Sequence, residues 1–462
     1  MLAVMGGGIA GLAAARELAR AAGTRVVLFE ASERLGGKIR TGALEGLQVE
    51  EGPDSFVAHD PAARRLCEEL GLGDELVEPA AFGAHVWLGD ELRPIPVGFV
   101  LGVPGDPLGV VSSRILSVRG TLRALGDLVL PGRLQGPDVS VGELVRRRFG
   151  PEVLDRLVDP ILAGTRAGSA DDMSLAAAAP QIDAVARAHR SITLGLVRDR
   201  RAGQGGGAPP FLGLRSGMER LVERLRDELA ESIDIRTATP VEGIAVGNGS
   251  YRLQHRGGET AADGVVIAAP AFAAAEALAG LSPEAAGELA AIDYASVGIV
   301  NLLYPPRGVR TPSHGSGILV PSSERRLLAG CTWTDRKWPH LAPPDGGTLI
   351  RCFVGRGGDE PALDLPDDEL ARRAAAELAA AMKLSVAPLA WRVTRWRRAI
   401  PQYAVGHNER MDLVESALAR WPGLALAGSA YRGSGLADCI IQGQSAARRA
   451  LAARRRPGLP LT

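Results

Sequence analysis

The chain has 462 residues, of which 46% are hydrophobic and 23% are charged. This length is more than one hydrophobic core usually serves, so the sequence predicts a globular protein of two or three domains. Lysine plus arginine equals aspartate plus glutamate at 53 each, which gives no net charge and therefore no global attraction to nucleic acid or acidic lipid.

Cysteine usage and hydropathy narrow the class of protein further. Cys67, Cys331, Cys352 and Cys439 form no C-x-x-C pair, which is typical of reduced, buried thiols and argues against a metal or iron–sulfur site. No apolar run reaches the roughly 18 residues needed to cross a bilayer. The N-terminus starts with an apolar strand and leaves no room for a signal peptide, so we expect a cytoplasmic protein.

The N-terminus predicts a strand, a glycine turn and a helix. Apolar residues 2–5 precede a G-x-G-x-x-G pattern at Gly6, Gly8 and Gly11. In such a turn the first glycine permits the bend, the second lets the backbone approach a pyrophosphate, and the third lets helix pack on strand. A second strand ends at Glu30, whose carboxylate would accept hydrogen bonds from ribose hydroxyls. This pattern predicts a dinucleotide site, and the acid argues against a 2′-phosphate.

The segment after Glu30 is more specific. It contains E-R-L-G-G-K over residues 33–38, and in this position it resembles the flavoprotein superfamily of amine oxidases, phytoene desaturases and porphyrinogen oxidases. The resemblance implies FAD as the cofactor. Paired glycines let the backbone pass close to phosphate, while Arg34 and Lys38 would offer positive charge to the pyrophosphate. For Lys38 the alternative is a solvated surface lysine.

The next segment narrows the resemblance. E-G-P-D-S-F over residues 51–56 looks like the porphyrinogen oxidases, haem-pathway enzymes acting on protoporphyrinogen IX or coproporphyrinogen III, in which this segment lies near the flavin. As a bare string it would also form a type I or II turn with proline in second position. Asp60 and Pro61 then open a helix that Gly71 closes.

The middle of the chain alternates between strands and helices. Short strand-like pieces occupy residues 82–107, and residues 112–201 are mostly helical, with a capping box at Ser140 and Glu143. The apolar stripes of these helices would bury a core of their own or face a membrane or a greasy substrate. A connector rich in glycine and proline follows at 202–210.

From residue 211 the nucleotide domain is predicted to resume. A helix at 218–229 and strands at 233–235 and 241–246 precede an apolar strand that ends at Pro270. Strand-like segments are then predicted on both sides of a long helix at 367–382, and the chain ends with a strand, a turn and a helix. We therefore predict an α/β fold with three parts: a discontinuous Rossmann-like FAD-binding domain (1–78, 211–275 and 394–462), a substrate-binding α+β domain (79–111 and 276–393) and a helical subdomain (112–201).

Segments 159–164, 167–168, 400–403 and 427–440 carry the same resemblance, and the last looks like the family's C-terminal flavin motif. There a helix N-terminus would face the pyrimidine end of the flavin. Carried over position by position, the implied FAD contacts are Gly6, Gly7, Gly8, Ile9, Ala10, Gly11, Glu30, Ala31, Arg34, Gly37, Lys38, Gly52, Pro53, Asp54, Ser55, Val241, Trp396, Ser434, Gly435 and Leu436. For Trp396 the alternative is an ordinary core tryptophan.

Two departures from the family pattern concern the substrate end. Arg166 stands where the family usually has an aromatic residue before Ala-Gly, and Ser434 and Ala437 stand where valine and proline are usual. Arg166 would hold a substrate propionate by a bidentate bond, or pair with Asp171 or Asp172 at the surface. The candidate propionate ligands are Arg166, Arg351 and Arg432, each with an ordinary surface arginine as the alternative.

The resemblance implies a six-electron oxidation of coproporphyrinogen III to coproporphyrin III. Hydride would pass from bridge carbons to flavin N5, and dioxygen would reoxidise the flavin and give hydrogen peroxide. The cation left by hydride loss sheds its proton easily, so no catalytic base is expected, and the chain has no Ser-His-Asp set, H-E-x-x-H or paired catalytic carboxylates. The arginine-rich, lysine-poor composition resembles actinobacterial chains, whose family members mostly act on coproporphyrinogen.

Other interpretations stay open at this stage. Protoporphyrinogen IX is the alternative substrate. An amine oxidase or carotenoid-type desaturase would share the fold, with Lys337 as the mid-chain lysine beside the flavin, and a flavin-binding chaperone for tetrapyrroles would lack turnover. The expected partners are a porphyrinogen and dioxygen, with no nucleic acid, no metal and no transmembrane segment; peripheral membrane contact and transient contact with the next haem-pathway enzyme are left open.

Overall fold

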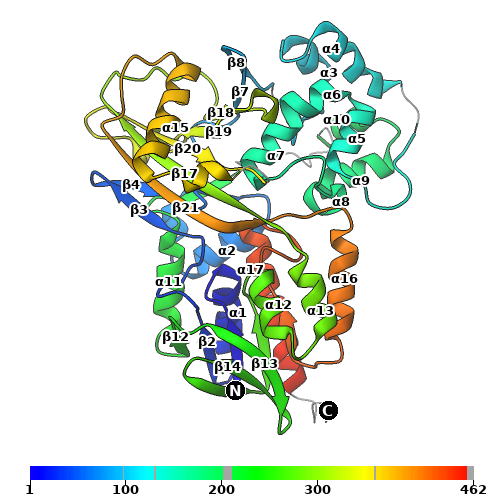
Figure 1. The fold of residues 1–462 in the computed structure, drawn as a ribbon, viewed down its shortest axis with the longest axis vertical. Helices are drawn as coiled ribbons and strands as arrows, with labels where there is room; N and C mark the ends of the chain where they lie inside the picture. Colours follow the sequence, from blue (N-terminus) through cyan, green and yellow to red (C-terminus); the bar gives the residue numbers. More distant parts are fainter. Residues whose placement is uncertain (97, 130–131, 201–210, 358–359, 455–462) are drawn as a thin grey trace.

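The computed structural model describes residues 1–96, 98–129, 132–200, 211–357 and 360–454. The connector expected at 202–210 lies outside these residues. Figure 1 shows three parts: a base that holds the N-terminal segment (blue) and the C-terminal helix (red), a sheet with one long helix at upper left, and a group of helices (cyan) at upper right. Within the described part of the chain, no helix is both long and apolar enough to cross a membrane.

A five-stranded parallel sheet forms the base, and distant stretches of sequence build it. Its strands are, in spatial order, β12 (Asp234–Arg236), β2 (Val26–Phe29), β1 (Leu2–Met5), β16 (Gly264–Ile267) and β22 (Leu424–Leu426). β1 pairs with β2 through Leu2 and Val26, and with β16 through Leu2 and Gly264. The prediction of a discontinuous Rossmann-like domain is therefore confirmed.

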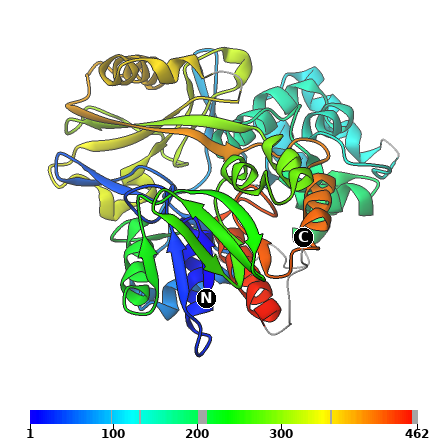
Figure 2. The same ribbon diagram turned by 60° about the horizontal axis from the view of Figure 1, so that its bottom comes forward.

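Helices cover both faces of this sheet, and β1, β2 and β16 are therefore buried along their whole length. One face carries α1 (Ile9–Ala19), α2 (Pro61–Glu69), α11 (Glu219–Leu229) and α17 (Leu436–Arg454). The other carries α12 (Ala271–Leu278), α13 (Pro283–Ala290), α16 (His407–Leu418) and a meander of β13 (Val241–Gly247), β14 (Ser250–His255) and β15 (Gly258–Ala262). Figure 2 shows this meander in green at the base of the molecule.

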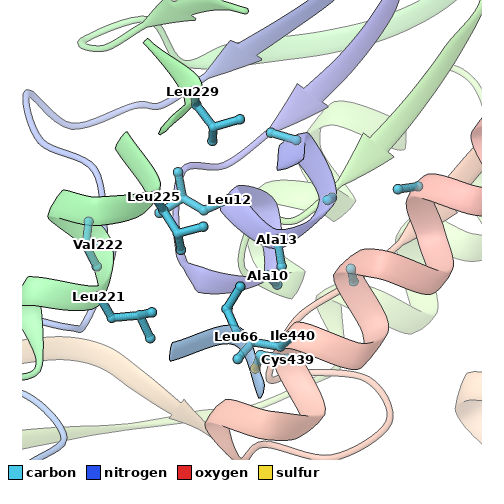
Figure 3. Close-up of a cluster of buried hydrophobic side chains, with 14 of the residues drawn as sticks. Ala10, Leu12, Ala13, Leu66, Leu221, Val222, Leu225, Leu229, Cys439 and Ile440 are labelled. Atoms are coloured by element: carbon cyan, nitrogen blue, oxygen red, sulfur yellow. The ribbon is translucent and has the colours of Figure 1, made fainter. Parts of the chain in front are cut away.

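The helix that begins at the glycine turn is the centre of the first core. Figure 3 shows α1 between α11 and α17, with side chains from all three elements in one apolar cluster. A Cβ placed on Gly443 of α17 would lie 2.1 Å from the carbonyl oxygen of Ala10, so the two helices pack backbone to backbone. This close contact fixes the start of α1 relative to the C-terminal segment.

A seven-stranded mixed sheet lies above the base. Its strands are, in order, β21 (Ala390–Pro401), β17 (Tyr294–Tyr304), β20 (Thr348–Val354), β19 (Leu328–Trp333), β18 (Gly317–Leu319), β7 (His85–Leu88) and β8 (Glu91–Pro94). The long helix α15 (Asp367–Met382) covers one face and buries Leu370 and Leu378 there. Two smaller sheets pair β3 (Thr41–Leu44) with β4 (Leu47–Glu50), and β11 (Phe211–Leu214) with β5 (Phe56–Val57) and β6 (Leu76–Val77). Leu44 and Val49 of the first pack against Leu303 and Leu349 of the seven-stranded sheet.

The helical part buries a hydrophobic core of its own, which confirms one of the two alternatives predicted for its apolar stripes. It consists of α3 (Pro107–Ser112), α4 (Val118–Leu125), α5 (Val141–Arg148), α6 (Pro151–Val153), a π-helical turn (Leu154–Val158), α7 (Asp159–Arg166), α8 (Leu175–Ala178), α9 (Pro180–Ala188) and α10 (Ile192–Asp199). The short strands β9 (Phe99–Val100) and β10 (Val103–Pro104) pack on it. At the predicted cap, Ser140 accepts a hydrogen bond from the Glu143 N–H at 3.0 Å.

Three predicted domain boundaries fall inside elements and need correction. The cut at 275/276 divides α12, and both α12 and α13 bury their alanine-rich faces in the core of the nucleotide domain. The cut at 393/394 divides β21, which pairs with β17 from Leu303–Ala390 to Tyr294–Pro401 without leaving the sheet. The cut at 111/112 falls within α3. At the first two cuts, packing or strand pairing continues across a position where the sequence motif changes. At the third, the helix extends to Ser112, although Val111 and Ser112 are both exposed.

Candidate FAD site

The glycine turn leaves an open cradle at Gly8. Gly6 has a φ of +105°, which L side chains rarely adopt, and a Cβ on Gly11 would lie 1.8 Å from the Gly6 carbonyl oxygen. No described atom lies within 4 Å of a Cβ built on Gly8. Gly8 is also the N-cap of α1, which among the described residues has no side-chain cap and no acid in its first turn. The turn therefore offers backbone N–H groups and space to an anion.

Glu30 lies beside this turn at the end of β2. Its carboxylate accepts hydrogen bonds from the Gly7 N–H at 2.7 Å and from the N–H and hydroxyl of Ser32 at 2.8 and 2.7 Å. A carboxylate has about four acceptor sites, so one remains for a ribose hydroxyl. Ala31 is exposed next to it. The bonds hold the carboxylate at the edge of the cradle.

The two basic residues of E-R-L-G-G-K have different surroundings. Arg34 donates to the carbonyls of Gly37 and Ile39 and to Glu219 at 2.9 Å. Glu219 therefore gives Arg34 a counter-ion within the protein, and a contact of Arg34 with the pyrophosphate stays a prediction. Lys38 is half-buried, burial lowers its pKa, and no described residue forms an ion pair with it. A desolvated ammonium is costly without an anion, so Lys38 is not a solvated surface lysine.

A row of side chains on three adjacent strands holds the segment at residues 50–55. Asn301 on β17 lies in register with Arg351 on β20 and with Arg392 on β21. They bond, respectively, the carbonyl of Glu50, the carbonyl of Gly52 and the carboxylate of Glu51. A Cβ on Gly52 would lie 1.8 Å from the Lys38 carbonyl oxygen, so the segment also packs against the E-R-L-G-G-K loop. The upper sheet thus fixes a loop of the nucleotide domain.

Asp54 is a buried charge between two cations. Its carboxylate accepts hydrogen bonds from Lys337 Nζ at 2.8 Å and Trp338 Nε1 at 3.1 Å, and Arg351 Nη1 lies 4.0 Å away. Burial alone would raise the pKa of Asp54, but Lys337 and Arg351 hold it well below its usual range. Ser55 adds a hydroxyl bond at 2.9 Å. The loop after Pro53 is therefore held by charge as well as by backbone contacts.

Glu50, at the start of this segment, titrates unusually. Burial raises its pKa to about 7, against hydrogen bonds from the Met218 N–H at 2.9 Å and Thr41 and the attraction of Arg351. A carboxyl group with this pKa changes its charge near neutral pH.

The C-terminal motif forms a tight loop before α17. Tyr403 donates its hydroxyl to the Ser429 carbonyl at 2.7 Å and accepts from the Gly433 N–H at 3.2 Å. The side-chain amide of Gln442, nearly two turns into α17, donates to the Gly433 carbonyl at 3.0 Å. The Gly435 N–H donates to Asp438 at 2.9 Å. The loop is rigid, while Ser434, Gly435 and Leu436 keep solvent-accessible surface.

An open cradle at a helix N-terminus, a placed carboxylate and an unpaired ammonium fit the pyrophosphate and ribose of FAD. The family model described as flavin containing amine oxidoreductase matches residues 9–451. The chain belongs to this family. It is an FAD-dependent oxidoreductase, and Glu30, Lys38 and the cradle at Gly8 are the residues of this chain suited to hold the cofactor.

Similar proteins match over nearly the whole chain. Coproporphyrinogen III oxidase of Bacillus subtilis is 36% identical, with 97% of each chain covered. Protoporphyrinogen oxidase of Bos taurus is 32% identical, with 97% of this chain and 98% of that one covered. A crystal structure from Exiguobacterium sp. 255-15, described as a protoporphyrinogen oxidase, has a TM-score of 0.86 at 32% identity and covers 97% of each chain.

Two further predicted FAD contacts lie near this flavoprotein site. Trp396 is half-buried, and its indole N–H donates to the carbonyl of Glu51, so it does not belong to the buried core. Val241 is buried at the start of β13, and the Thr239 N–H two residues earlier donates to the Glu30 carbonyl at 2.8 Å. Both side chains are thus placed beside the segments that line the site.

The three candidate propionate ligands are in unlike positions. Arg432 pairs with Asp412 and Glu415 at the surface, and Arg351 is buried beneath the segment at 50–55. Arg432 is thus engaged with two carboxylates, whereas Nε of Arg351 is buried without a hydrogen-bond partner among the described residues. A propionate role stays a prediction for both. Arg166 instead donates to Ser434 at 2.9 Å, while Asp171, its expected surface partner, bonds Arg146 at 2.7 Å.

Several functional residues were not found from the sequence. Asn301 and Arg392 gain their roles only from strand register, which a single sequence does not reveal. Glu219, the partner of Arg34, lies 185 positions away. Gln442 carried a usable signal, because it follows Asp438 by four residues on one face of a helix.

Proposed function

We propose that this flavoprotein oxidises coproporphyrinogen III to coproporphyrin III, with dioxygen as the electron acceptor. The observation that carries the proposal is the match to the Bacillus subtilis coproporphyrinogen III oxidase across nearly the full length of both chains. The bovine relative makes protoporphyrinogen IX the second candidate. The seven-stranded sheet and the helical part would then bind the tetrapyrrole above the flavin.

Bound FAD would supply a hydride acceptor, flavin N5, for a bridge carbon of the porphyrinogen. The residues of this chain serve mainly to position the reactants. The row of Asn301, Arg351 and Arg392 holds the segment at 50–55, and Tyr403 and Gln442 hold the C-terminal loop. The proposed FAD contacts are Gly6, Gly7, Gly8, Ile9, Ala10, Gly11, Glu30, Ala31, Arg34, Gly37, Lys38, Gly52, Pro53, Asp54, Ser55, Val241, Trp396, Ser434, Gly435 and Leu436.

The direct test supplies each porphyrinogen to FAD-loaded protein and follows oxygen uptake together with porphyrin fluorescence. We expect turnover with coproporphyrinogen III, three oxygen molecules consumed for each porphyrin formed, and slower turnover with protoporphyrinogen IX. Faster oxidation of protoporphyrinogen IX would select the second candidate. No oxygen uptake with either substrate would contradict the proposal.

An amine oxidase is the rival within the same family. The contacts of Lys337 count against it, because this lysine bonds the buried carboxylate of Asp54 at 2.8 Å and so has a structural partner. Peroxide release with polyamines or amino acids, but with neither porphyrinogen, would favour the rival. Tight porphyrin binding without flavin reduction would instead favour a non-catalytic tetrapyrrole carrier.

We infer a cytoplasmic location, because all four cysteines are unpaired and buried, as is typical of proteins from reducing compartments. Dioxygen and the enzyme that next uses the porphyrin are the proposed partners. Cell fractionation with a periplasmic marker tests the location, and recovery of the protein with that marker would contradict it.

A further inference from the structure

Arg166 and Ser434, two residues at which the sequence was expected to differ from the family, meet in the structure. Arg166, the last residue of α7, donates from Nη1 to the hydroxyl of Ser434 at 2.9 Å, although 268 positions separate them. Arg166 belongs to the helical part, and Ser434 belongs to the loop of residues 427–435 before α17, which we call the flavin loop because of its proposed role. The pair therefore joins the helical part to the flavin loop.

The end of α7 is held firmly. The side-chain amide of Gln402 donates to the Arg166 carbonyl at 3.1 Å, and the Gly357 N–H donates to the carbonyl of Ala167. Ala167 has a φ of +52°, which turns the chain sharply away from the helix. The base of the Arg166 side chain is fixed by its backbone and its tip by Ser434. A guanidinium fixed at both ends loses little entropy when a ligand binds.

The charge of Arg166 has no counter-ion among the described residues. Burial lowers its pKa, with a weaker opposing influence from Tyr403 and Asp438. Ser434 is neutral, and the ring of Tyr403 lies 5.9 Å from the guanidinium carbon. An arginine has five N–H donors, and a desolvated cation is costly without an anion. The surroundings of Arg166 are therefore completed best by a carboxylate from a ligand.

We propose that Arg166, oriented by Ser434, binds a carboxylate of the substrate at the flavin end of the site and so selects acidic tetrapyrroles. This inference rests on the proposed function, because it takes the substrate to be a propionate-bearing porphyrinogen. The guanidinium presents a fork of donors that matches a carboxylate. Lysine at this position would keep the charge but lose the fork.

The test measures binding of coproporphyrin III to FAD-loaded protein by porphyrin fluorescence, and compares it with the tetramethyl ester in the same non-ionic detergent. Arg166→Gln should weaken binding of the acid about ten- to hundred-fold and leave binding of the ester within about two-fold. Ser434→Ala should weaken acid binding less, because the guanidinium remains. The matched control is Arg119→Gln, an exposed arginine of α4, which should change neither affinity.

Flavin content and thermal unfolding of each variant establish that it is folded. Arg166→Lys is the second variant, expected to bind the acid about three- to ten-fold more weakly with the ester unchanged. Wild-type affinity of both Arg166 variants for the acid would overturn the inference, and so would an equal loss for acid and ester, which indicates ring packing alone.

Binding needs no turnover, so the inference and the proposed function fail separately. If the wild-type protein oxidises no porphyrinogen, but substitution of Arg166 abolishes the preference for the acid over the ester, the proposed function alone is contradicted. If the wild-type protein oxidises coproporphyrinogen, but the Arg166 variants keep the preference for the acid over the ester, this inference alone is contradicted.

Discussion

Gly8 and Gly11 belong to one motif, but the structure predicts opposite effects when each is replaced by alanine. Gly8 has φ −71° and ψ 178°, which alanine adopts freely, and no described atom lies within 4 Å of the added Cβ. Gly8→Ala should therefore leave the unfolding free energy of the apoprotein unchanged or raise it by up to about 1 kcal/mol, because the unfolded chain loses freedom. At Gly11 the Cβ would lie 1.8 Å from the Gly6 carbonyl oxygen, so the backbone must move. Gly11→Ala should cost about 3 kcal/mol or more.

Although Gly8→Ala should not destabilise the apoprotein, we expect it to weaken the binding of FAD. The methyl group would occupy the space that the pyrophosphate needs, and overpacking of this kind costs about 1–3 kcal/mol, or roughly ten- to hundred-fold in affinity. The assays are urea unfolding of flavin-stripped protein and titration with FAD followed by flavin fluorescence. Gly287→Ala on α13, where the added Cβ also meets no described atom within 4 Å, is the matched control and should bind FAD normally. A Gly8→Ala protein with wild-type FAD affinity would refute the assignment of the cradle.

Three further changes test the surrounding charges. Asp54→Asn should lower the unfolding free energy by about 3–5 kcal/mol in urea, because Lys337 and Arg351 lose a buried counter-ion; a loss below about 1 kcal/mol would contradict this. For Glu50, the pKa rises from 4.5 to about 7 on folding, so the folded state holds the proton and wild-type stability should fall as pH rises across this range, by at most about 1.4 kcal/mol per unit. Glu50→Gln should remove this dependence of the unfolding free energy on pH. If the unfolding free energies of the wild type and the variant change in parallel between pH 5 and 7, this explanation is refuted. Arg432→Gln should change stability by less than about 1 kcal/mol and leave coproporphyrin affinity intact; weaker binding would support Arg432 as a propionate ligand.

The cofactor end of the molecule was predictable because its determinants are local. Gly6, Gly8, Gly11 and Glu30 lie within one strand–turn–helix–strand unit, where each glycine meets a backbone demand that sequence spacing expresses. The long helix at 367–382 was likewise predictable, since its first turn is acidic and its apolar residues repeat at helical spacing. In these segments the chain neighbours of a residue determine its environment.

The sequence reveals less where long-range contacts determine the environment. For Arg34, the sequence does not reveal that Glu219 reaches it from another helix. For Arg351 the alternative was an ordinary surface arginine, yet its strand lies inside the sheet and the segment at 50–55 covers it. The domain boundary at 393/394 was drawn at a motif containing Trp396, although β21 continues through it. Partner charges and strand order are properties of the fold that no local pattern reports.

The discontinuous path of the chain explains how the sheet can influence the cofactor. The segment at 50–55 belongs to the nucleotide domain by sequence, but Asn301, Arg351 and Arg392 of the sheet hold it. Arg166 links the helical part to the flavin loop at Ser434 in the same way. Each part above the base thus bonds a loop of the nucleotide domain, so a displacement of the sheet or of α7 would reach these loops through single hydrogen bonds. Because Arg166 and Ser434 bond each other across two parts of the fold, we expect that exchanging one alone disturbs this link, whereas exchanging both for an apolar pair removes the buried charge together with its hydrogen-bond partner.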